Sequence, residues 1–166
     1  MFTELVLCML LTCIAPHPVY QPQILEQKVG YKPYQEVVNE NELKCLTDNI
    51  YYEAGIEKDI GKKAVALVTM NRLKSNEYAN TICKVVHQRD KYRCQFSWTC
   101  FKKRQKIDVF VYARCRKIAK EVMINYEVMH DVTKGATYFH RYDIRPPWAI
   151  KTKLTVVIGK HKFYKI

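Results

Sequence analysis

The chain has 166 residues, of which 48% are hydrophobic and five are glycine, and this composition excludes a disordered or collagen-like polypeptide. At this length one domain is expected, with enough side chains to bury a core. No apolar run approaches the roughly 18 residues of a membrane-spanning helix. The seven cysteines are too few and too widely spaced for a disulfide miniprotein. We therefore expect a monomer with no transmembrane span.

The formal net charge is +12, and its distribution along the chain is uneven. Residues 1–42 carry 2 basic and 5 acidic side chains, whereas residues 43–166 carry 26 basic and 11 acidic ones. A field of this sign speeds the encounter with an anionic partner. Nucleic acid, an acidic membrane surface and an anionic cell wall all meet that condition, and charge alone does not choose between them.

The first 42 residues differ from the rest of the chain. Leu5 to Ala15 form a stretch of eleven mostly apolar residues, the length of a signal-peptide core. No Lys or Arg precedes it and Pro16 follows at once, so a loosely packed N-terminal helix is the alternative. The prolines that follow indicate a linker. The sequence thus predicts an apolar leader (signal peptide or anchor) and a Pro-rich linker over residues 1–42, then one domain over residues 43–166.

Apolar spacing predicts four helices in the first part of this domain. Leu43, Leu46 and Ile50 recur at helical intervals, and Asn41 is a candidate N-cap for the first helix. The remaining predictions are a second helix that begins at Asp59, a third over residues 78–87, a loop over 89–105 and a fourth helix over 108–125.

The pattern changes near the end of the chain. Residues 136–141, 154–158 and 161–165 are rich in Thr, Val, Tyr and Phe, which is typical of strands. Gly159-Lys160 between the last two runs suits a type II′ hairpin turn. Helices followed by a small antiparallel sheet make an α+β domain.

Glu53 is the first candidate for chemistry. It lies three residues after Ile50 and seven after Leu46, on or beside the apolar face of the first helix, and Glu57 follows at i+4. Burial disfavours the charged carboxylate and raises its pKa, as a general acid for glycoside cleavage requires at neutral pH. The alternative is a surface glutamate paired with Lys58, Lys62 or Lys63.

The loop between the third and fourth helices holds a second cluster, from Cys94 to Cys100. Aromatic faces stack on sugar rings or bases, and amides hydrogen-bond hydroxyl and acetamido groups. The alternative is that the aromatic side chains pin the loop to the core. A loop-closing disulfide between Cys94 and Cys100 is a further interpretation for an oxidising compartment. The candidate binding residues are Gln95, Phe96, Ser97 and Trp98.

The strand over residues 136–141 carries the third group. Alternation sends Tyr138 and His140 to one face and Thr137 and Phe139 to the other, so one face can line a cleft while the other packs on helices. Trp148 follows shortly after and joins the candidate binding residues.

Other catalytic signatures are missing from the sequence. There is no Gly-rich phosphate loop, no HExxH helix and no GxSxG elbow, and the spacing of Cys94 and Cys100 does not match a zinc finger. We therefore expect neither a metal nor a cofactor. Five cysteines follow the apolar leader, so at least one is expected to stay free or to pair between chains.

Taken together, these segments resemble the SleB-type cell-wall hydrolases, which are the catalytic domains of spore cortex-lytic enzymes and their phage relatives. The resemblance covers essentially residues 43–166. Its motifs follow the family's order: Cys45–Ala54 with Glu57, Ala64–Val68 with Asn71-Arg72, Thr81–Gln88, Cys94–Cys100, Gly135–His140, Trp148-Ala149, and Ile158-Gly159 through His161, Phe163 and Tyr164.

The resemblance implies a lysozyme- or transglycosylase-like fold and cleavage of peptidoglycan between N-acetylmuramic acid and N-acetylglucosamine. Lytic transglycosylation is the implied reaction, with Glu53 as the single acid and base and 1,6-anhydro sugars as products. The implied partners are peptidoglycan glycan strands and the anionic wall surface, with nucleic acid disfavoured. Action at the bacterial envelope is implied, in the periplasm or wall after export, as a phage lysis or tail-associated protein or as a bacterial remodelling enzyme.

Two departures from the family pattern qualify these expectations. The family usually has Arg-Gly where this chain has Gly55-Ile56, so Glu57 is ranked as a second catalytic candidate behind Glu53. Tyr138 stands where His is common, and a tyrosine cannot act as a cation near neutral pH. The alternatives are a lysozyme-like muramidase that uses Glu57 or Asp59 to position water, and a non-catalytic binding protein on the same scaffold.

Overall fold

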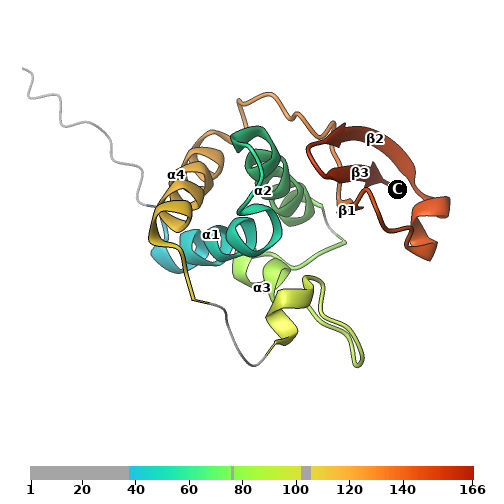
Figure 1. The fold of residues 1–166 in the computed structure, drawn as a ribbon, viewed down its shortest axis with the longest axis horizontal. Coiled ribbons are helices and arrows are strands. Elements are labelled where there is room, and N and C mark those ends of the chain that lie inside the picture. Colours follow the sequence, from blue (N-terminus) through green and yellow to red (C-terminus); the bar gives the residue numbers. More distant parts are fainter. Residues whose placement is uncertain (1–37, 76, 102–105) are drawn as a thin grey trace, which may run out of the picture. The chain divides into compact units, whose positions relative to one another are not determined.

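The structure, a computed structural model, describes residues 38–75, 77–101 and 106–166. The predicted leader and most of the predicted linker therefore lie outside the described residues. The described part contains four α-helices followed by one antiparallel sheet, as the α+β prediction requires (Figure 1). Its elements are α1 (Glu40–Ala54), α2 (Asp59–Lys74), α3 (Ile82–Val86), the 3-10 helix η1 (Ser97–Cys100), α4 (Val109–Asn125), β1 (Tyr138–Arg141), the 3-10 helix η2 (Pro147–Lys151), β2 (Lys153–Ile158) and β3 (His161–Lys165).

The N-cap of helix α1 lies two residues before the predicted one. The side chain of Asn39, not Asn41, caps the helix, since its Oδ1 accepts hydrogen bonds from the backbone N–H groups of Asn41 and Glu42. Asn39 is the residue with extended backbone angles, so Asn41 is already inside the first turn. The helix ends at Ala54, which leaves Glu57 in the turn that leads to α2 and not on the helix.

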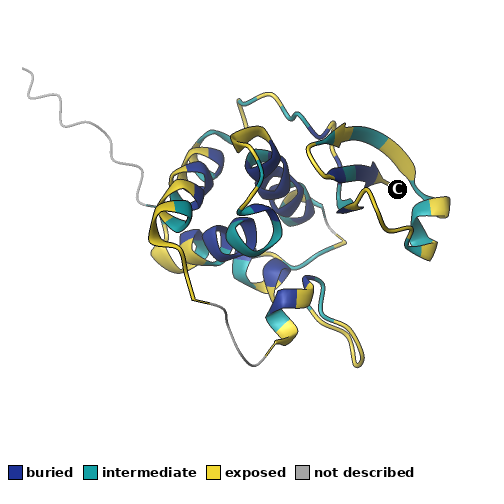
Figure 2. Cartoon of the chain, viewed as in Figure 1, coloured by how far each residue is buried: buried dark blue, intermediate teal, exposed yellow. Residues whose placement is uncertain are grey.

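The core lies where α1 packs against α2, α3 and α4. The predicted apolar stripes are the buried faces of these helices, which Figure 2 shows in dark blue. Burial of such side chains is the main free energy that holds the helices together, at about 25 cal/mol for each Å² removed from water. The buried members of this cluster are Leu43, Leu46, Ile50, Ala66, Leu67, Met70, Ile82, Val86, Phe96, Trp98, Cys115, Ile118, Ala119 and Val122.

The third helix is shorter than predicted. Thr81 caps α3, because its side chain accepts a hydrogen bond from the N–H of Lys84, and the helix therefore starts at Ile82 and not near Tyr78. None of the helices in the described part is long and apolar enough to cross a membrane.

Two disulfides brace the helical part. Cys45 of α1 is bonded to Cys83 of α3, and Cys94 is bonded to Cys100 across the loop that carries η1. The second of these is the predicted loop-closing bridge, whereas the first was not predicted. Cys115 remains free and buried in α4, in line with the expectation of an unpaired cysteine.

The sheet has the strand order β1-β3-β2, and both neighbouring pairs are antiparallel. The pairing of Ile158 with His161 leaves Gly159 and Lys160 as a two-residue turn. The positive φ of 56° at Gly159, without a positive φ at Lys160, is the pattern of the predicted type II′ turn. Phe163 of β3 is fully buried with Ala64 and Val68 of α2, which fixes the sheet against that helix.

Candidate active site

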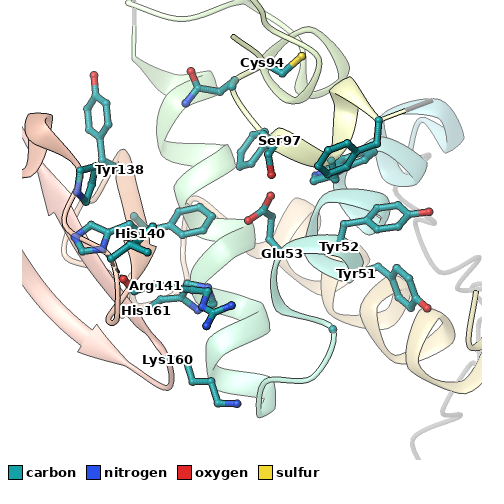
Figure 3. Close-up of a pocket in the computed structure, with 18 of the residues that line it drawn as sticks. Tyr51, Tyr52, Glu53, Cys94, Ser97, Tyr138, His140, Arg141, Lys160 and His161 are labelled. Atoms are coloured by element: carbon teal, nitrogen blue, oxygen red, sulfur yellow. Dashed lines mark hydrogen bonds between the residues drawn. The ribbon is translucent and has the colours of Figure 1, made fainter. Parts of the chain in front are cut away.

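A groove of about 1580 Å³ lies between the end of α1, the loop before η1 and the sheet (Figure 3). This volume exceeds the roughly 300–1,000 Å³ of a pocket for one small molecule, so it has room for several units of a polymer. Every residue predicted to act in the proposed catalysis or binding, apart from the alternative Asp59, contributes to its lining: Glu53, Glu57, Gln95, Phe96, Ser97, Trp98, Tyr138, His140 and Trp148.

Glu53 occupies the last turn of α1 and lies at the centre of the groove, with Ser97 on one side and the sheet on another (Figure 3). The same helical spacing that buries Leu46 and Ile50 brings Glu53 to the edge of the core, where it is partly buried. Burial raises the pKa of Glu53 from 4.5 to about 7, and the positive charge of Arg72 opposes this rise. At neutral pH a large fraction of this carboxyl group therefore keeps its proton.

Two of the three lysines proposed as alternative partners of Glu53 have other partners. Lys63 forms an ion pair with Glu121 of α4 at 2.7 Å, and the buried Lys62 donates a hydrogen bond to the backbone carbonyl of Glu57. Among the described residues, Glu53 takes part in none of the ion pairs within 4.0 Å. The structure thus favours the interpretation of Glu53 as a groove residue over its interpretation as a surface residue in an ion pair.

Arg72 is a groove residue that the sequence analysis did not single out. It belongs to α2, is 3% exposed, and donates through Nε to the carbonyl of Thr137 at 2.6 Å. Its guanidinium group lies 5.1–5.8 Å from the ring centres of Tyr78, Phe96 and Tyr138. Arg72 therefore places a fixed positive charge behind the acid, among aromatic faces that come from three distant parts of the chain.

The same arginine orients Gln95. In the amide orientation that satisfies both groups, Gln95 Oε1 accepts hydrogen bonds from the two terminal nitrogens of Arg72 at 2.9 and 3.0 Å. The NH₂ group of Gln95 then remains as a donor at the groove. A donor of this kind suits the carbonyl of an acetamido group or the oxygen of a hydroxyl.

Phe96 and Trp98 pin the loop to the core, which was the alternative interpretation of this cluster. They are 3% and 7% exposed, Trp98 donates through Nε1 to Asn49 Oδ1 at 3.1 Å, and its ring is stacked on Tyr52. One face of Trp98 is therefore occupied within the protein, although the residue still lines the groove. The exposed Ser97 between the two aromatic residues is directed toward Glu53 (Figure 3).

The sheet forms the opposite wall. Tyr138 and His140 both contact the ring of Trp148, whereas Phe139 packs on Phe163, so the side chains alternate as predicted. Phe139 lines the groove as well, so the groove is not confined to one face of the strand as expected. His140 is buried, and its two ring nitrogens lie 2.9 Å from the hydroxyl of Tyr164 and 2.6 Å from the carbonyl of Arg141. His140 thus shapes the wall, and Tyr138 and Trp148 are its more accessible aromatic residues.

Glu57 reaches the groove from the turn between α1 and α2. Its carboxylate lies directly against Gly159, so that a Cβ atom added to this glycine would collide with Oε2. Asp59, the other carboxylate considered for positioning water, pairs with Arg114 and does not line the groove. Asp90 and Asp108 do line it, but both cap backbone N–H groups of their own segments.

Further lining residues were missed because their position depends on tertiary contacts. Tyr51 and Tyr52 directly precede Glu53 in α1, and Arg141, Lys160 and His161 come from the sheet and its hairpin turn (Figure 3). The signal available for Tyr51 and Tyr52 was their place beside Glu53 in the sequence.

Within the described residues no group of three or more His, Cys, Asp or Glu side chains is arranged to hold a metal ion.

A family model with the description Cell Wall Hydrolase matches residues 56–164, which is more than half of the chain. The match begins after Glu53, so the place of Glu53 in the groove is an observation independent of it. A search of curated protein sequences gives no match.

Two solved structures share the fold. The catalytic domain of the germination-specific lytic transglycosylase SleB from Bacillus anthracis is 21% identical, with a TM-score of 0.59 over 78% of this chain and 98% of that one. The catalytic domain of the Bacillus cereus SleB protein is 20% identical, with a TM-score of 0.56 over 78% of this chain and 94% of that one.

Proposed function

The chain belongs to the cell wall hydrolase family, and from this premise we propose that it cuts the glycan strands of peptidoglycan as a lytic transglycosylase with Glu53 as acid and base. The observation that carries the proposal is the carboxyl group of Glu53, which lies in a long groove with a pKa of about 7. The bond to be cut is the one between N-acetylmuramic acid and N-acetylglucosamine. The Bacillus anthracis protein, whose catalytic domain has the same fold, is a lytic transglycosylase, and this likeness supports the same type of reaction here.

A single carboxyl group is sufficient for this reaction. Glu53 donates its proton to the glycosidic oxygen as the bond from that oxygen to C1 of the muramic acid breaks. The C6 hydroxyl of the same sugar then bonds to C1, and its proton passes to the Glu53 carboxylate. The products are a 1,6-anhydro sugar and a new free hydroxyl end, and Glu53 is protonated again for the next cycle.

Arg72 supports both halves of this cycle. Between the two proton transfers Glu53 is a carboxylate in a partly buried site, where an unpaired negative charge is costly. The nearby guanidinium offsets part of that cost, and this is the reason that its charge lowers the pKa of Glu53. A pKa that burial raises to about 7 and Arg72 keeps from rising further suits a group that must give and take a proton.

We assign substrate binding to the polar and aromatic lining. Gln95 offers its NH₂ group, Ser97 its hydroxyl, and Tyr138 and Trp148 offer aromatic surface for sugar rings. Phe96, Trp98 and His140 are buried, and in this proposal they contribute edges of the surface while they hold the walls in place. Glu57 is proposed to act on the sheet side of the groove and not as the proton donor.

Action outside the cytoplasm fits the covalent structure. One disulfide links α1 to α3 and the other closes the loop that carries η1, and such bonds form and persist in oxidising compartments. The basic domain complements the anionic polymers of a bacterial wall. We therefore propose that the protein acts at the bacterial cell envelope.

A hydrolytic muramidase is the second candidate, because Glu57 also lines the groove and could hold a water molecule. Mass spectrometry of the products from purified peptidoglycan separates the two reactions. Transglycosylation predicts anhydro ends, which are lighter by one water than the reducing ends left by hydrolysis. Reducing ends alone would overturn the transglycosylase proposal, and binding without any cleavage would favour the non-catalytic alternative.

A further inference from the structure

Residues 88–95 form a narrow hairpin between α3 and η1, which Figure 1 shows as the yellow-green loop that extends away from the helices. Three backbone contacts join its arms: the antiparallel bridge of Arg89 with Cys94, the hydrogen bond from Gln95 N–H to the Gln88 carbonyl at 2.8 Å, and the one from Asp90 N–H to the Arg93 carbonyl at 2.9 Å. The disulfide from Cys94 to Cys100 ties its base to η1. These contacts hold the segment in one shape, and we call residues 88–95 the basic hairpin.

The basic hairpin has more positive than negative charge, because it contains Arg89, Lys91 and Arg93 but a single acid, Asp90. Hydrogen bonds from the backbone N–H groups of Tyr92 and Arg93 to Asp90 Oδ1 fold the tip and lower the pKa of this acid. The ion pair of Asp90 with Arg93 is 3.6 Å long and joins exposed side chains, where such a pair contributes little. Arg89 forms no ion pair within 4.0 Å with any other described residue.

Both arginines of the basic hairpin line the groove, whereas Lys91 and Tyr92 at its tip do not. The side chains of Arg89 and Arg93 are exposed, so a ligand in the groove can reach them. Cys94, at the base of the hairpin, lies on the same side of Glu53 as Ser97 (Figure 3). A group that projects from a strand bound over Glu53 can therefore meet the hairpin at the edge of the groove.

The cations on the sheet side of the groove are balanced by acids. Arg141 forms an ion pair with Asp143, and the carboxylate of Glu57 rests against Gly159, which precedes Lys160. The positive charge that is left for a ligand thus lies on the side of the basic hairpin. An anionic part of the substrate is attracted to that side.

We propose that Arg89 and Arg93 bind carboxylate groups of the peptides attached to N-acetylmuramic acid, so that the protein prefers glycan strands that carry these peptides. This site rests on the proposed function, because it takes peptidoglycan as the substrate. The sugar rings are uncharged, whereas the peptides project from the strand and end in free carboxylates. Arginine matches a carboxylate with two parallel hydrogen bonds, which makes it well suited to this contact.

The first test compares two substrates that differ only in charge. Both are tetrasaccharides of alternating N-acetylglucosamine and N-acetylmuramic acid with a tetrapeptide on each muramic acid, and in one of them the carboxylates are converted to methyl amides. KM of the wild type should be about tenfold higher for the amide form, the size of two exposed charge-assisted pairs, with kcat changed much less. Salt at about 0.5 M should reduce the difference. Equal KM values at low salt would overturn the proposal.

Substitutions of the arginines locate the contact. Arg89→Gln combined with Arg93→Gln should raise KM for the charged substrate about tenfold, to the value for the amide form. Lys117→Gln combined with Lys120→Gln removes the same charge from exposed positions of α4 outside the groove and should leave KM and kcat unchanged. Lys91→Gln, at the tip of the same hairpin, should change KM less than about twofold. Equal effects of the three variants would indicate attraction by net charge and overturn the assignment to the two arginines.

Two further substrates identify the anionic group. Strands from which an amidase has removed the peptides keep one carboxylate on the lactyl group of each muramic acid, and they should behave like the amide form. Binding as tight as that of peptide-bearing strands would place the recognised carboxylate on the sugar and overturn the peptide assignment. An effect of the arginine pair that appears only with walls that retain teichoic acid would assign the site to phosphate and overturn the proposal as well.

A binding measurement separates this site from the proposed reaction. In the Glu53→Gln background, which is expected to bind without turnover, replacing both arginines should raise the dissociation constant of the peptide-bearing tetrasaccharide about tenfold, while thermal unfolding shows that the variant is folded. An unchanged dissociation constant would overturn the site on the hairpin and leave the proposed reaction standing. No binding of either tetrasaccharide by Glu53→Gln itself would count against the glycan strand as the ligand, and so against both proposals.

Discussion

The carboxyl group of Glu53 and the guanidinium group of Arg72 act on each other inside the groove. The charge of each group opposes the pKa shift that burial causes in the other. Burial raises the pKa of Glu53 to about 7, while the charge of Arg72 lowers it. In the same way, burial lowers the pKa of Arg72, and the charge of Glu53 raises it. The pair therefore sets how readily the proposed acid gives up its proton.

Glu53 should make the protein less stable as the pH rises. A carboxyl group whose pKa is higher in the folded than in the unfolded state contributes stability that is complete below 4.5 and lost as the pH rises through about 7. Glu53→Gln cannot ionise, so its free energy of unfolding should exceed that of the wild type at pH 8 by up to roughly 3 kcal/mol, with little difference at pH 4. Thermal unfolding of both proteins across this range measures the effect, and parallel curves would contradict it.

Two substitutions of Arg72 should separate its charge from its hydrogen bonds. Arg72→Met removes the charge that lowers the pKa of Glu53, so the pH at which activity is half lost should move upward from about 7. Arg72→Lys keeps a charge but not the paired contact with Gln95, so that pH should change little while KM rises. The pH dependence of the initial rate measures the first effect, and substrate titration at one pH measures the second. Equal shifts of the half-loss pH in the two variants would be inconsistent with a charge effect.

The two disulfides should differ in what their removal costs. Replacing Cys45 and Cys83 by serine opens a longer loop and should cost roughly 4 kcal/mol of stability, with little change in KM for the molecules that remain folded. Replacing Cys94 and Cys100 should cost roughly 2 kcal/mol but raise KM several-fold, because this bridge closes the loop that presents Gln95 and Ser97. Denaturant unfolding and substrate titration together distinguish the two pairs, and identical behaviour would argue against a role of the second bridge in binding.

Gly159→Ala should disturb the groove through Glu57. The added Cβ atom would collide with the carboxylate, at a backbone position with φ of +56° that alanine tolerates poorly. Gly135→Ala is the matched control, because Gly135 has φ of +78° but nothing within 4 Å of the added atom. Both variants should lose about 1 kcal/mol from backbone strain, and only Gly159→Ala should also lose activity. A comparable loss of activity in both would point to strain and not to Glu57.

Much of the fold could be predicted from local patterns. The apolar intervals of α1 and α4 are strong because each of these helices buries one face, whereas α2 is buried on all sides over residues 64–70. The sequence Gly159-Lys160 predicts the hairpin because glycine suits a positive φ. The cap at Asn39 was misplaced by two residues, since Asn39 and Asn41 have the same side chain and only the backbone angles distinguish them.

The candidate site was predictable where one segment carries the signal. The spacing of Glu53 from Leu46 and Ile50 indicated its place at the edge of the core, and its raised pKa follows from that burial. Arg72 was missed because the aromatic residues around it come from the segment between α2 and α3, the loop before η1 and β1, which no single window of sequence contains. The bond between Cys45 and Cys83 was missed for the same reason, since cysteine spacing does not determine which cysteines pair.

The role of Glu53 is tested most directly by the initial rate at which purified peptidoglycan is solubilised by the wild type and by Glu53→Gln at pH 6. We predict that the wild type is active and loses activity as the pH rises through about 7, and that Glu53→Gln is at least about 100-fold slower although it binds the same glycan strands. A Glu53→Gln protein that solubilises the wall at the wild-type rate would contradict the assignment of Glu53 as the acid.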